Sequence, residues 1–430
     1  MARLTYPTYS SHCGWNAMLP VREARAALEG DIRVRYAVIG AGYTGVAAAW
    51  RLAELDPTAE IALLESSRVG EGSSARNSGF LGRRVMPKDA SDEMAAKAQI
   101  LSRYQAEGFD WLKDRIEAHD IDCQLKRTGY IRTAATERGR SVVEVAREVA
   151  RKNAIPHEVL SRHDLERRIG TAYYTIGLHL EDNYLLQPAA LIRGLADALP
   201  SQVALHENTP VLGMRLDGKW RLETPNGAVT ADKVVLATNG FITKFGYLKS
   251  RLVTIYTYAA VTAAIPDADS RWAGADDDWG VLPSHRLGTT LRRIGPNRLM
   301  VRSLYSYEDE LDEPRVIRAL RTRFERRWPA LRHVPFEYVW GGTTALTMNG
   351  SPWWGRVDEN LYASGGCNGG GIVKGTLLGK HMAEMMTGHG DQSELFASLG
   401  LANWIAPEPF RAMGFRVISA YERHRAGLEM

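Results

Sequence analysis

Cysteine is scarce in this 430-residue chain, which has only three. Cys13, Cys123 and Cys367 are widely separated and form no C-x-x-C pair. An odd number of separated cysteines predicts neither a disulfide framework nor a cysteine-based structural metal site, and it fits a reducing compartment. The scattered histidines also lack the spacing of metal ligands, so we expect no metal cofactor.

Long apolar runs are absent as well, and none reaches the length of a membrane span. The first residues show no basic-then-apolar pattern of a signal peptide, so we expect a cytoplasmic protein. The formal charge is +4 with basic residues spread along the chain, which gives no support to nucleic-acid binding. A composition of 45% hydrophobic and 24% charged residues is that of an ordinary globular protein, long enough for two closely joined domains.

One stretch, residues 33–82, organises the rest of the chain. The apolar run Tyr36–Ile39 predicts a buried strand, the turn Gly40-Ala41-Gly42-Tyr43-Thr44-Gly45 follows it at once, and residues 46–55 predict a helix. Strand, glycine turn and helix in this order are typical of a dinucleotide-binding unit.

Each glycine of the turn has a physical role in such a unit. Gly40 allows the tight turn, Gly42 lets the backbone approach a pyrophosphate, and Gly45 lets the helix pack closely on the strand. The helix N-terminus then offers free N–H groups and a partial positive charge to the phosphates. A second strand, residues 60–64, ends in Glu65, about twenty residues beyond the last glycine, where an acid binds ribose hydroxyls. Such an acid disfavours NADP relative to NAD or FAD.

Two further segments bear on the choice between NAD and FAD. Residues 68–79 form either a polar surface loop or a turn that brings backbone amides and a positive charge to a second phosphate or a flavin ring. Residues 361–364 predict a strand, which runs through the glycine-rich residues 365–371 into a helix over 372–386. The N-terminus of that helix can face a flavin, where its positive end would stabilise the negative charge of the reduced ring.

The sequences GAGYTG and LLESSRVGEGSSARNSGFL resemble the FAD-dependent D-amino-acid oxidase/sarcosine oxidase (DAO) family, and most of all its gamma-glutamylputrescine oxidase and L-pipecolate oxidase branch. The resemblance runs from Trp15 to about Arg411. It implies a mixed α/β fold, a Rossmann-type FAD-binding domain joined to a substrate domain with a mostly antiparallel sheet. Alternating strand patterns at 253–262, 288–293 and 298–304 agree with such a sheet.

We therefore predict a discontinuous FAD-binding domain and a substrate domain. The FAD-binding domain takes residues 31–90, 150–245 and 340–395, and the substrate domain takes 91–149 and 246–339. An N-terminal extension, residues 1–30, and a C-terminal helical tail, residues 396–430, complete the chain.

The motifs and the resemblance together predict the residues that bind the cofactor. They are Gly40, Gly42, Tyr43, Thr44, Gly45, Glu65, Ser66, Arg68, Gly72, Ser73, Ser74, Arg76, Asn77, Ser78, Val211, Ala237, Thr238, Asn239, Gly366, Asn368, Gly369, Gly370, Gly371 and Ile372. Some members of the family attach the flavin through a cysteine just before the turn that corresponds to Pro352. This chain has Thr343–Thr347 there, so we expect non-covalent FAD.

The resemblance implies that a C–H bond next to an amine gives hydride to flavin N5, and that the imine formed is hydrolysed. Oxygen then reoxidises the flavin and yields hydrogen peroxide. The expected substrates are a secondary amine, a cyclic imino acid or a polyamine derivative. A flavin dehydrogenase that passes electrons to a quinone or another carrier, and a non-catalytic flavoprotein, remain alternatives; a plain NAD dehydrogenase would leave the second glycine unit without a purpose.

An amino-acid substrate needs a cation in the pocket, because a buried carboxylate must be paired. The candidates are Arg292 and Arg302 on predicted strands, while Tyr258 and Tyr305 are candidates for lining the pocket and Trp340 for lying near the flavin. For these aromatic residues ordinary core packing is the alternative. Lys374 lies one residue away from the position of a family lysine, which leaves that role unassigned. The oligomeric state is left open.

Overall fold

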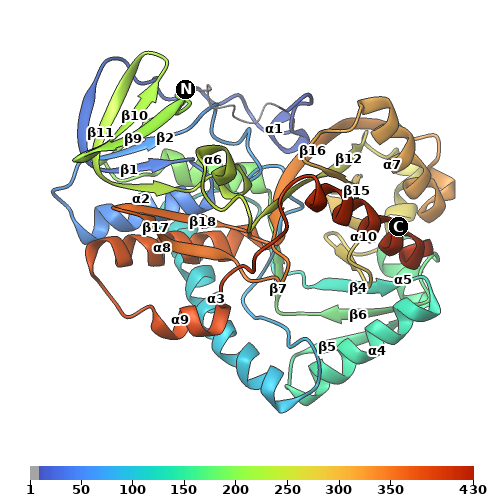
Figure 1. Cartoon of the computed structure of the whole chain (residues 1–430). Coiled ribbons are helices and arrows are strands. Elements are labelled where there is room, and N and C mark those ends of the chain that lie inside the picture. The colour runs from blue at the N-terminus through green and yellow to red at the C-terminus, as the bar shows by residue number, and fades with distance from the viewer. Residues whose placement is uncertain (1–8) are drawn as a thin grey trace.

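The structure is a computed structural model that describes residues 9–430, so residues 1–8 of the predicted N-terminal extension lie outside the described residues. Two eight-stranded sheets and one two-stranded sheet form its framework. Figure 1 shows the first large sheet with helices α2 (Tyr43–Leu55) and α8 (Gly371–Thr387) beside it, and the second large sheet next to it. This architecture confirms the mixed α/β fold with a Rossmann-type unit and a second, mostly antiparallel sheet.

The first sheet holds the strand–glycine–helix units. Its main path is β17 (Trp353–Asp358), β18 (Leu361–Gly365), β11 (Gly227–Leu236), β1 (Ile32–Ile39), β2 (Ile61–Leu64) and β8 (Val203–His206), with β10 (Lys219–Thr224) paired to β11 and β9 (Gly213–Asp217) paired to β10. The four pairings that join β18, β11, β1, β2 and β8 are parallel. All residues of β2 and β18 are buried, as expected for parallel strands covered on both faces.

The second sheet is antiparallel except for one pair. Its order is β16 (Phe336–Leu346), β12 (Val253–Thr262), β15 (Arg298–Tyr307), β14 (Thr290–Ile294), β13 (Gly280–Pro283), β4 (Tyr130–Ala134), β6 (Ile176–Leu180) and β5 (His157–Ser161). The β13–β4 pair is parallel. A small sheet of β3 (Phe80–Gly82) and β7 (Asn183–Leu185) lies apart from both large sheets in the pairing pattern.

Close helix packing holds the cofactor half together. The other helices are α1 (Gly14–Ala17), α3 (Asp92–Ala118), α4 (Glu137–Lys152), α5 (Arg162–Ile169), α6 (Pro188–Asp197), α7 (Glu313–Arg327), α9 (Ser393–Leu399) and α10 (Phe410–Ala426). Helices α2 and α8 touch through glycine, since a Cβ added at Gly379 would lie 2.2 Å from the carbonyl oxygen of Thr44.

Within residues 9–430 no helix is both long enough and apolar enough to cross a membrane.

The strand pairings move two of the predicted domain boundaries. We placed residues 150–245 with the FAD-binding part, yet β6 pairs with β4 and β5 pairs with β6, so both strands belong to the second sheet. Strand β16 likewise belongs to the second sheet along its whole length, although the predicted boundary falls at residue 340. Apolar alternation identifies a strand but not its partner, so these assignments depend on long-range hydrogen bonds.

Candidate active site

A large cavity of about 560 Å³ lies where the two sheets meet. On one side it is lined by the carboxyl ends of β1, β2, β11 and β18, which supply Ile39, Leu64, Ala237 and Ser364. Ligands of open α/β sheets bind outside the carboxyl ends of the strands. The opposite side is lined by residues of the second sheet, so that one cavity joins a dinucleotide site to a pocket.

The first glycine turn has the geometry that a dinucleotide requires. Gly40 has φ of +100°, a conformation that glycine adopts without strain, and its N–H donates to the carbonyl oxygen of Leu64 at 2.8 Å. A Cβ at Gly45 would lie 1.8 Å from the carbonyl oxygen of Gly40, which explains why the helix can pack this closely on the turn. Helix α2 begins at Tyr43, three residues earlier than the sequence pattern predicts. Gly45 therefore packs behind the cavity wall and does not line it.

Glu65 occupies the position expected of a ribose-binding acid, at the end of β2. One carboxylate oxygen accepts the N–H of Ala41 at 2.9 Å, and the other accepts the hydroxyl of Ser66 at 3.1 Å. These bonds fix the carboxylate at the mouth of the glycine turn, where it lines the cavity.

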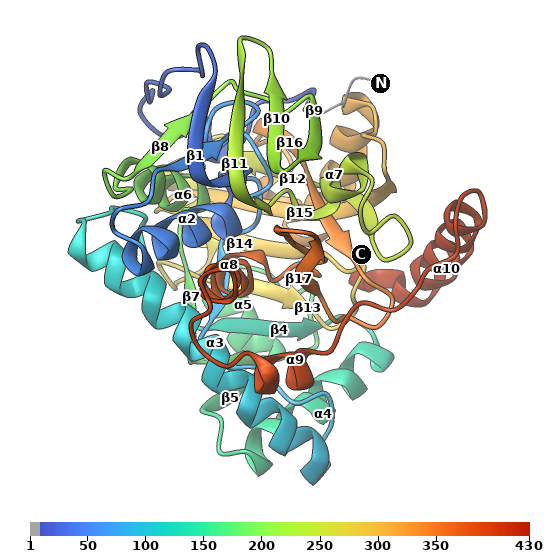
Figure 2. The ribbon, with the colours of Figure 1, turned by 60° about the vertical axis from the view of Figure 1, so that its left-hand side comes forward.

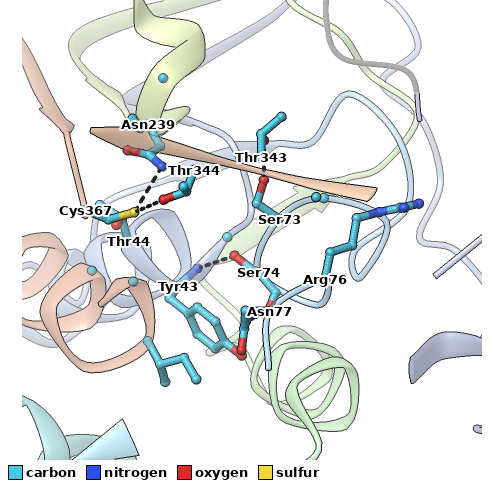
Figure 3. A pocket seen from close by; sticks show the side chains of 18 of the residues that line it. Tyr43, Thr44, Ser73, Ser74, Arg76, Asn77, Asn239, Thr343, Thr344 and Cys367 are labelled. Carbon is cyan, nitrogen blue, oxygen red and sulfur yellow. Dashed lines mark hydrogen bonds between the residues drawn. The ribbon is translucent and has the colours of Figure 1, made fainter. Parts of the chain in front are cut away.

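The loop of residues 66–79 is a turn held by hydrogen bonds and not a free surface loop. Ser74 Oγ accepts the N–H of Tyr43 at 3.3 Å, and Asn77 braces the turn through its bond to the carbonyl oxygen of Ser74 at 2.6 Å (Figure 3). Ser73 and Thr343 hydroxyls lie 2.6 Å apart and join this loop to β16. Tyr43, Ser73, Ser74 and Asn77, which we predicted to bind the cofactor, line the cavity together with Thr343.

Arg76 lines the cavity, and its guanidinium also contacts the backbone around it. Its guanidinium donates to the carbonyl oxygens of Glu71 at 2.7 Å, Gly341 at 2.9 Å and Ser11 at 2.9 Å, and it lies over the ring of Tyr9. Figure 3 shows the side chain directed away from Tyr43 and Ser74. Three of its five N–H donors therefore tie three segments of backbone together.

The second glycine unit closes the cavity from the other side. Gly369, Gly371 and Ile372, at the start of α8, line the cavity together with Asn239. Gly366, Asn368 and Gly370 do not line it; Asn368 instead accepts the N–H of Thr347 at 2.9 Å and holds the loop in shape. The remaining predicted cofactor residues line the cavity: Gly40, Gly42, Thr44, Ser66, Arg68, Gly72, Ser78, Val211, Ala237 and Thr238.

The cavity also contains polar atoms that lack a partner within residues 9–430. Thr238 Oγ1, after β11, and Thr257 Oγ1, on β12, are buried and form no hydrogen bond. Both residues line the cavity. A buried hydroxyl without a partner costs free energy, so such atoms mark places where a bound molecule would complete the structure. The glycine turn that begins at Gly40, the hydrogen-bonded carboxylate of Glu65 and the Thr238 hydroxyl together form a dinucleotide cradle, and this cradle fits an FAD-type dinucleotide.

The pocket end of the cavity is built from the second sheet. In the strand register Thr290 lies opposite Arg302, which lies opposite Ala259. Thr257, Thr290 and Arg302 all line the cavity, so this face of the sheet is the pocket wall. The Arg302 guanidinium donates to the Tyr305 hydroxyl at 3.2 Å and forms no ion pair with a carboxylate of residues 9–430.

The other predicted substrate residues lie outside the cavity wall. Arg292 is buried behind it, donating to the carbonyl oxygens of Leu186 at 2.5 Å and Ser78 at 3.1 Å, and burial lowers its pKa to about 10. Tyr258 faces the opposite side of β12 and bonds to Ser306 at 2.7 Å. Successive side chains of a strand alternate between faces, so the neighbour Thr257 takes the pocket position and Tyr258 the core position.

Tyr305 and Trp340 also have structural partners. The hydroxyl of Tyr305 donates to the carbonyl oxygen of Arg286 at 3.1 Å. The indole N–H of Trp340 donates to the carbonyl oxygen of Arg76 at 3.3 Å. Trp340 packs edge-on against Trp15 in the core. Neither residue lines the cavity.

Lys374 and Cys367 line the cavity without having been predicted to bind anything there. The Lys374 ammonium has a long 3.5 Å contact to the carbonyl oxygen of Cys367, and burial lowers its pKa. Cys367 Sγ lies 3.3 Å from the hydroxyl of Thr344 and 3.4 Å from the amide of Asn239 (Figure 3). In the described part of the chain, no group of three or more His, Cys, Asp or Glu side chains could hold a metal ion.

Residues 35–385 match the family model described as FAD dependent oxidoreductase, DAO. The match covers most of the chain, and the chain belongs to this family. The protein is thus an FAD-dependent oxidoreductase, as the fold and the cavity indicate.

Its relatives in sequence and structure agree with this assignment. The chain is 26% identical over 427 residues to the "Probable oxidoreductase OrdL" of Rhizobium meliloti, covering 96% of this chain and 97% of that protein. It is 27% identical over 402 residues to the gamma-glutamylputrescine oxidoreductase of Escherichia coli, covering 90% and 92%. The crystal structure of glycine oxidase from Geobacillus kaustophilus has the same fold, with a TM-score of 0.71 at 20% identity over 84% of this chain and 96% of that one.

Proposed function

We propose that this protein oxidises the C–N bond of an amino acid or cyclic imino acid to an imine, with oxygen as electron acceptor. The observation that carries the proposal is Arg302, which lines the same cavity as the dinucleotide cradle and has a hydroxyl, not a carboxylate, as its partner. A cation placed in this way fits the carboxylate of a substrate. When bound, FAD supplies the hydride acceptor and passes the electrons on to oxygen, which gives hydrogen peroxide.

The charges of the cavity support an anionic substrate over a simple polyamine. Among the described residues that line it, Glu65 is the only acid, and it lies beside the first glycine turn, where it accepts the N–H of Ala41. Arg302 and Lys374 contribute positive charge elsewhere on the wall. A polyamine would bring further positive charge into this cavity without a carboxylate to pair it.

The polar groups of the wall suggest how a substrate would be held. Arg302 would bind the carboxylate, and the unpartnered hydroxyl of Thr257 would accept or donate a hydrogen bond at the amine or carboxylate. The lining contains no histidine among residues 9–430, and we propose that the amine arrives in its neutral form instead of losing a proton to a side chain.

The proposal is tested by anaerobic bleaching of the purified yellow protein with single compounds. The panel includes L-pipecolate, L-proline, D-amino acids, sarcosine, gamma-glutamylputrescine and simple polyamines. Bleaching by a compound with a carboxylate, followed by oxygen uptake and peroxide formation on admitting air, supports the proposal. Bleaching by polyamines alone would contradict the carboxylate role of Arg302, and bleaching without oxygen uptake would indicate a dehydrogenase with another acceptor. If no compound bleaches the flavin, a non-catalytic flavoprotein becomes the better explanation.

A further inference from the structure

Helix α10 is held to the body of the protein by one face only. Ser419 and Ala426 on this face are buried, and Glu422 pairs with His285 at 3.0 Å and Arg286 at 2.9 Å. Arg411 adds a bond to the carbonyl oxygen of Leu252 at 3.2 Å. In Figure 2 the helix projects at the right-hand edge of the molecule, away from both large sheets.

The opposite face of α10 is an exposed apolar stripe. The exposed fractions of its members are high: Phe410 65%, Met413 58%, Val417 70%, Ile418 51% and Tyr421 58%. Their spacing of three and four residues places them along one side of the helix. Single exposed apolar residues are normal on a protein surface, whereas a continuous row of this length marks a surface that binds something.

A helix glycine lies within the same stripe. Gly414 would have no atom within 4 Å of an added Cβ, so the surface around it is open. The segment that leads into the helix exposes two more apolar side chains, Trp404 at 59% and Leu401 at 40%. The apolar surface therefore continues beyond the first turn of the helix.

The charges beside the stripe are positive. Arg416 and Arg423 are exposed on α10, and Arg423 also donates to the carbonyl oxygen of Tyr305 at 3.4 Å. The only acid in the helix, Glu422, is turned inward to His285 and Arg286. A partner for this surface must consequently offer apolar groups together with negative charge.

We infer that α10 is an interfacial helix that lies on an anionic lipid bilayer. An amphipathic helix with aromatic and aliphatic residues on one face and arginines beside it inserts its apolar face at the headgroup boundary and pairs its cations with anionic lipids. A second copy of this chain fits the charges less well, because a symmetric contact through α10 would place Arg416 and Arg423 opposite an equally basic helix. The inference concerns a surface remote from the cavity and does not depend on the substrate.

Co-sedimentation of the FAD-loaded protein with lipid vesicles tests the inference. One set of vesicles is pure phosphatidylcholine and the other contains phosphatidylglycerol as well. We expect binding to the anionic vesicles that weakens with added salt, and little binding to the neutral ones. The double variant Met413→Glu/Val417→Glu should lower the partition coefficient about tenfold or more, because two charges would enter the apolar layer.

A matched control separates this effect from general surface changes. Val145→Glu alters an equally exposed apolar residue, 52% exposed, on a different helix, α4, and should bind vesicles like the unaltered protein. Flavin absorbance and circular dichroism of all variants report that the fold is intact. The inference is overturned if the protein does not bind anionic vesicles, or if Met413→Glu/Val417→Glu and Val145→Glu bind equally well. It is also overturned if light scattering shows a dimer that the double variant abolishes, since the stripe then binds a second copy.

Discussion

Thr290 on β14 and Arg302 on β15 lie directly opposite each other in the antiparallel ladder, and both side chains line the cavity. Arg302 is thereby fixed by sheet register and not by a flexible loop. Replacing Arg302 by Gln should raise KM for a carboxylate substrate about 10- to 100-fold. The reason is that the substrate would lose a hydrogen bond between charged groups, which contributes about 1.5–3 kcal/mol. Steady-state kinetics measure this.

The control for Arg302 lies on the same strand. Arg298 donates to the carbonyl oxygen of Thr262 at 2.9 Å, outside the cavity lining, so Arg298→Gln should leave KM within about twofold of the unaltered value. An Arg302→Gln variant with an unchanged KM would show that the carboxylate binds elsewhere, with Lys374 as the next candidate.

Glu65 should contribute to FAD affinity. Glu65→Gln removes the charge and turns one acceptor oxygen into a donor, so we expect FAD to bind about tenfold more weakly. Fluorescence titration of the apoprotein measures the affinity. Glu54→Gln, on the exposed side of α2 where Glu54 pairs with Arg51, is the matched control and should have little effect.

Two helix glycines should respond in opposite ways to the same change. Gly45→Ala would place a methyl group 1.8 Å from the carbonyl oxygen of Gly40, so we expect a loss of about 1–3 kcal/mol of stability and weaker FAD retention. Gly414→Ala meets no atom within 4 Å and should be neutral or stabilising by up to about 1 kcal/mol, because alanine favours helix over glycine. Thermal unfolding compares them, and equal effects would mean that Gly45 is not a packing requirement.

Stability should fall at alkaline pH because of His381. Burial alone would lower its pKa, but the hydrogen bonds and charges of Glu107 and Glu384 outweigh burial and raise its pKa to about 9. The stabilisation is therefore complete below the unfolded pKa of about 6.5 and is lost as pH rises through about 9, a change of about 3 kcal/mol. Denaturant unfolding at several pH values measures it. His381→Asn should remove this pH dependence, whereas exposed His389→Asn should retain it.

The flavin should be released by acid. Cys367 is the one cysteine of the described residues that lines the cavity, and its thiol contacts Thr344 and Asn239. We expect the yellow colour to stay in the supernatant after acid precipitation, in both the unaltered protein and Cys367→Ser. Colour that remains in the pellet of the first and leaves that of the second would identify Cys367 as a covalent attachment site.

Local sequence determined the cofactor half of this protein. The positions of Gly40, Gly45 and Glu65 in the turn, the helix and the strand end could be predicted, because these features depend on residues close together in the chain. The same holds for the second glycine unit before α8. The fold class followed from these units and their order.

Only the tertiary structure decided which residues line the pocket. Arg292 and Arg302 both lie on strands of the second sheet. Only Arg302 of the two lines the cavity, whereas Arg292 donates hydrogen bonds to the backbone carbonyl oxygens of Ser78 and Leu186. Thr257 and Tyr258 differ only in the face they occupy, which depends on where the core lies. Strand register and partner choice are set by hydrogen bonds between distant segments, so composition and periodicity could name the candidates but not select among them.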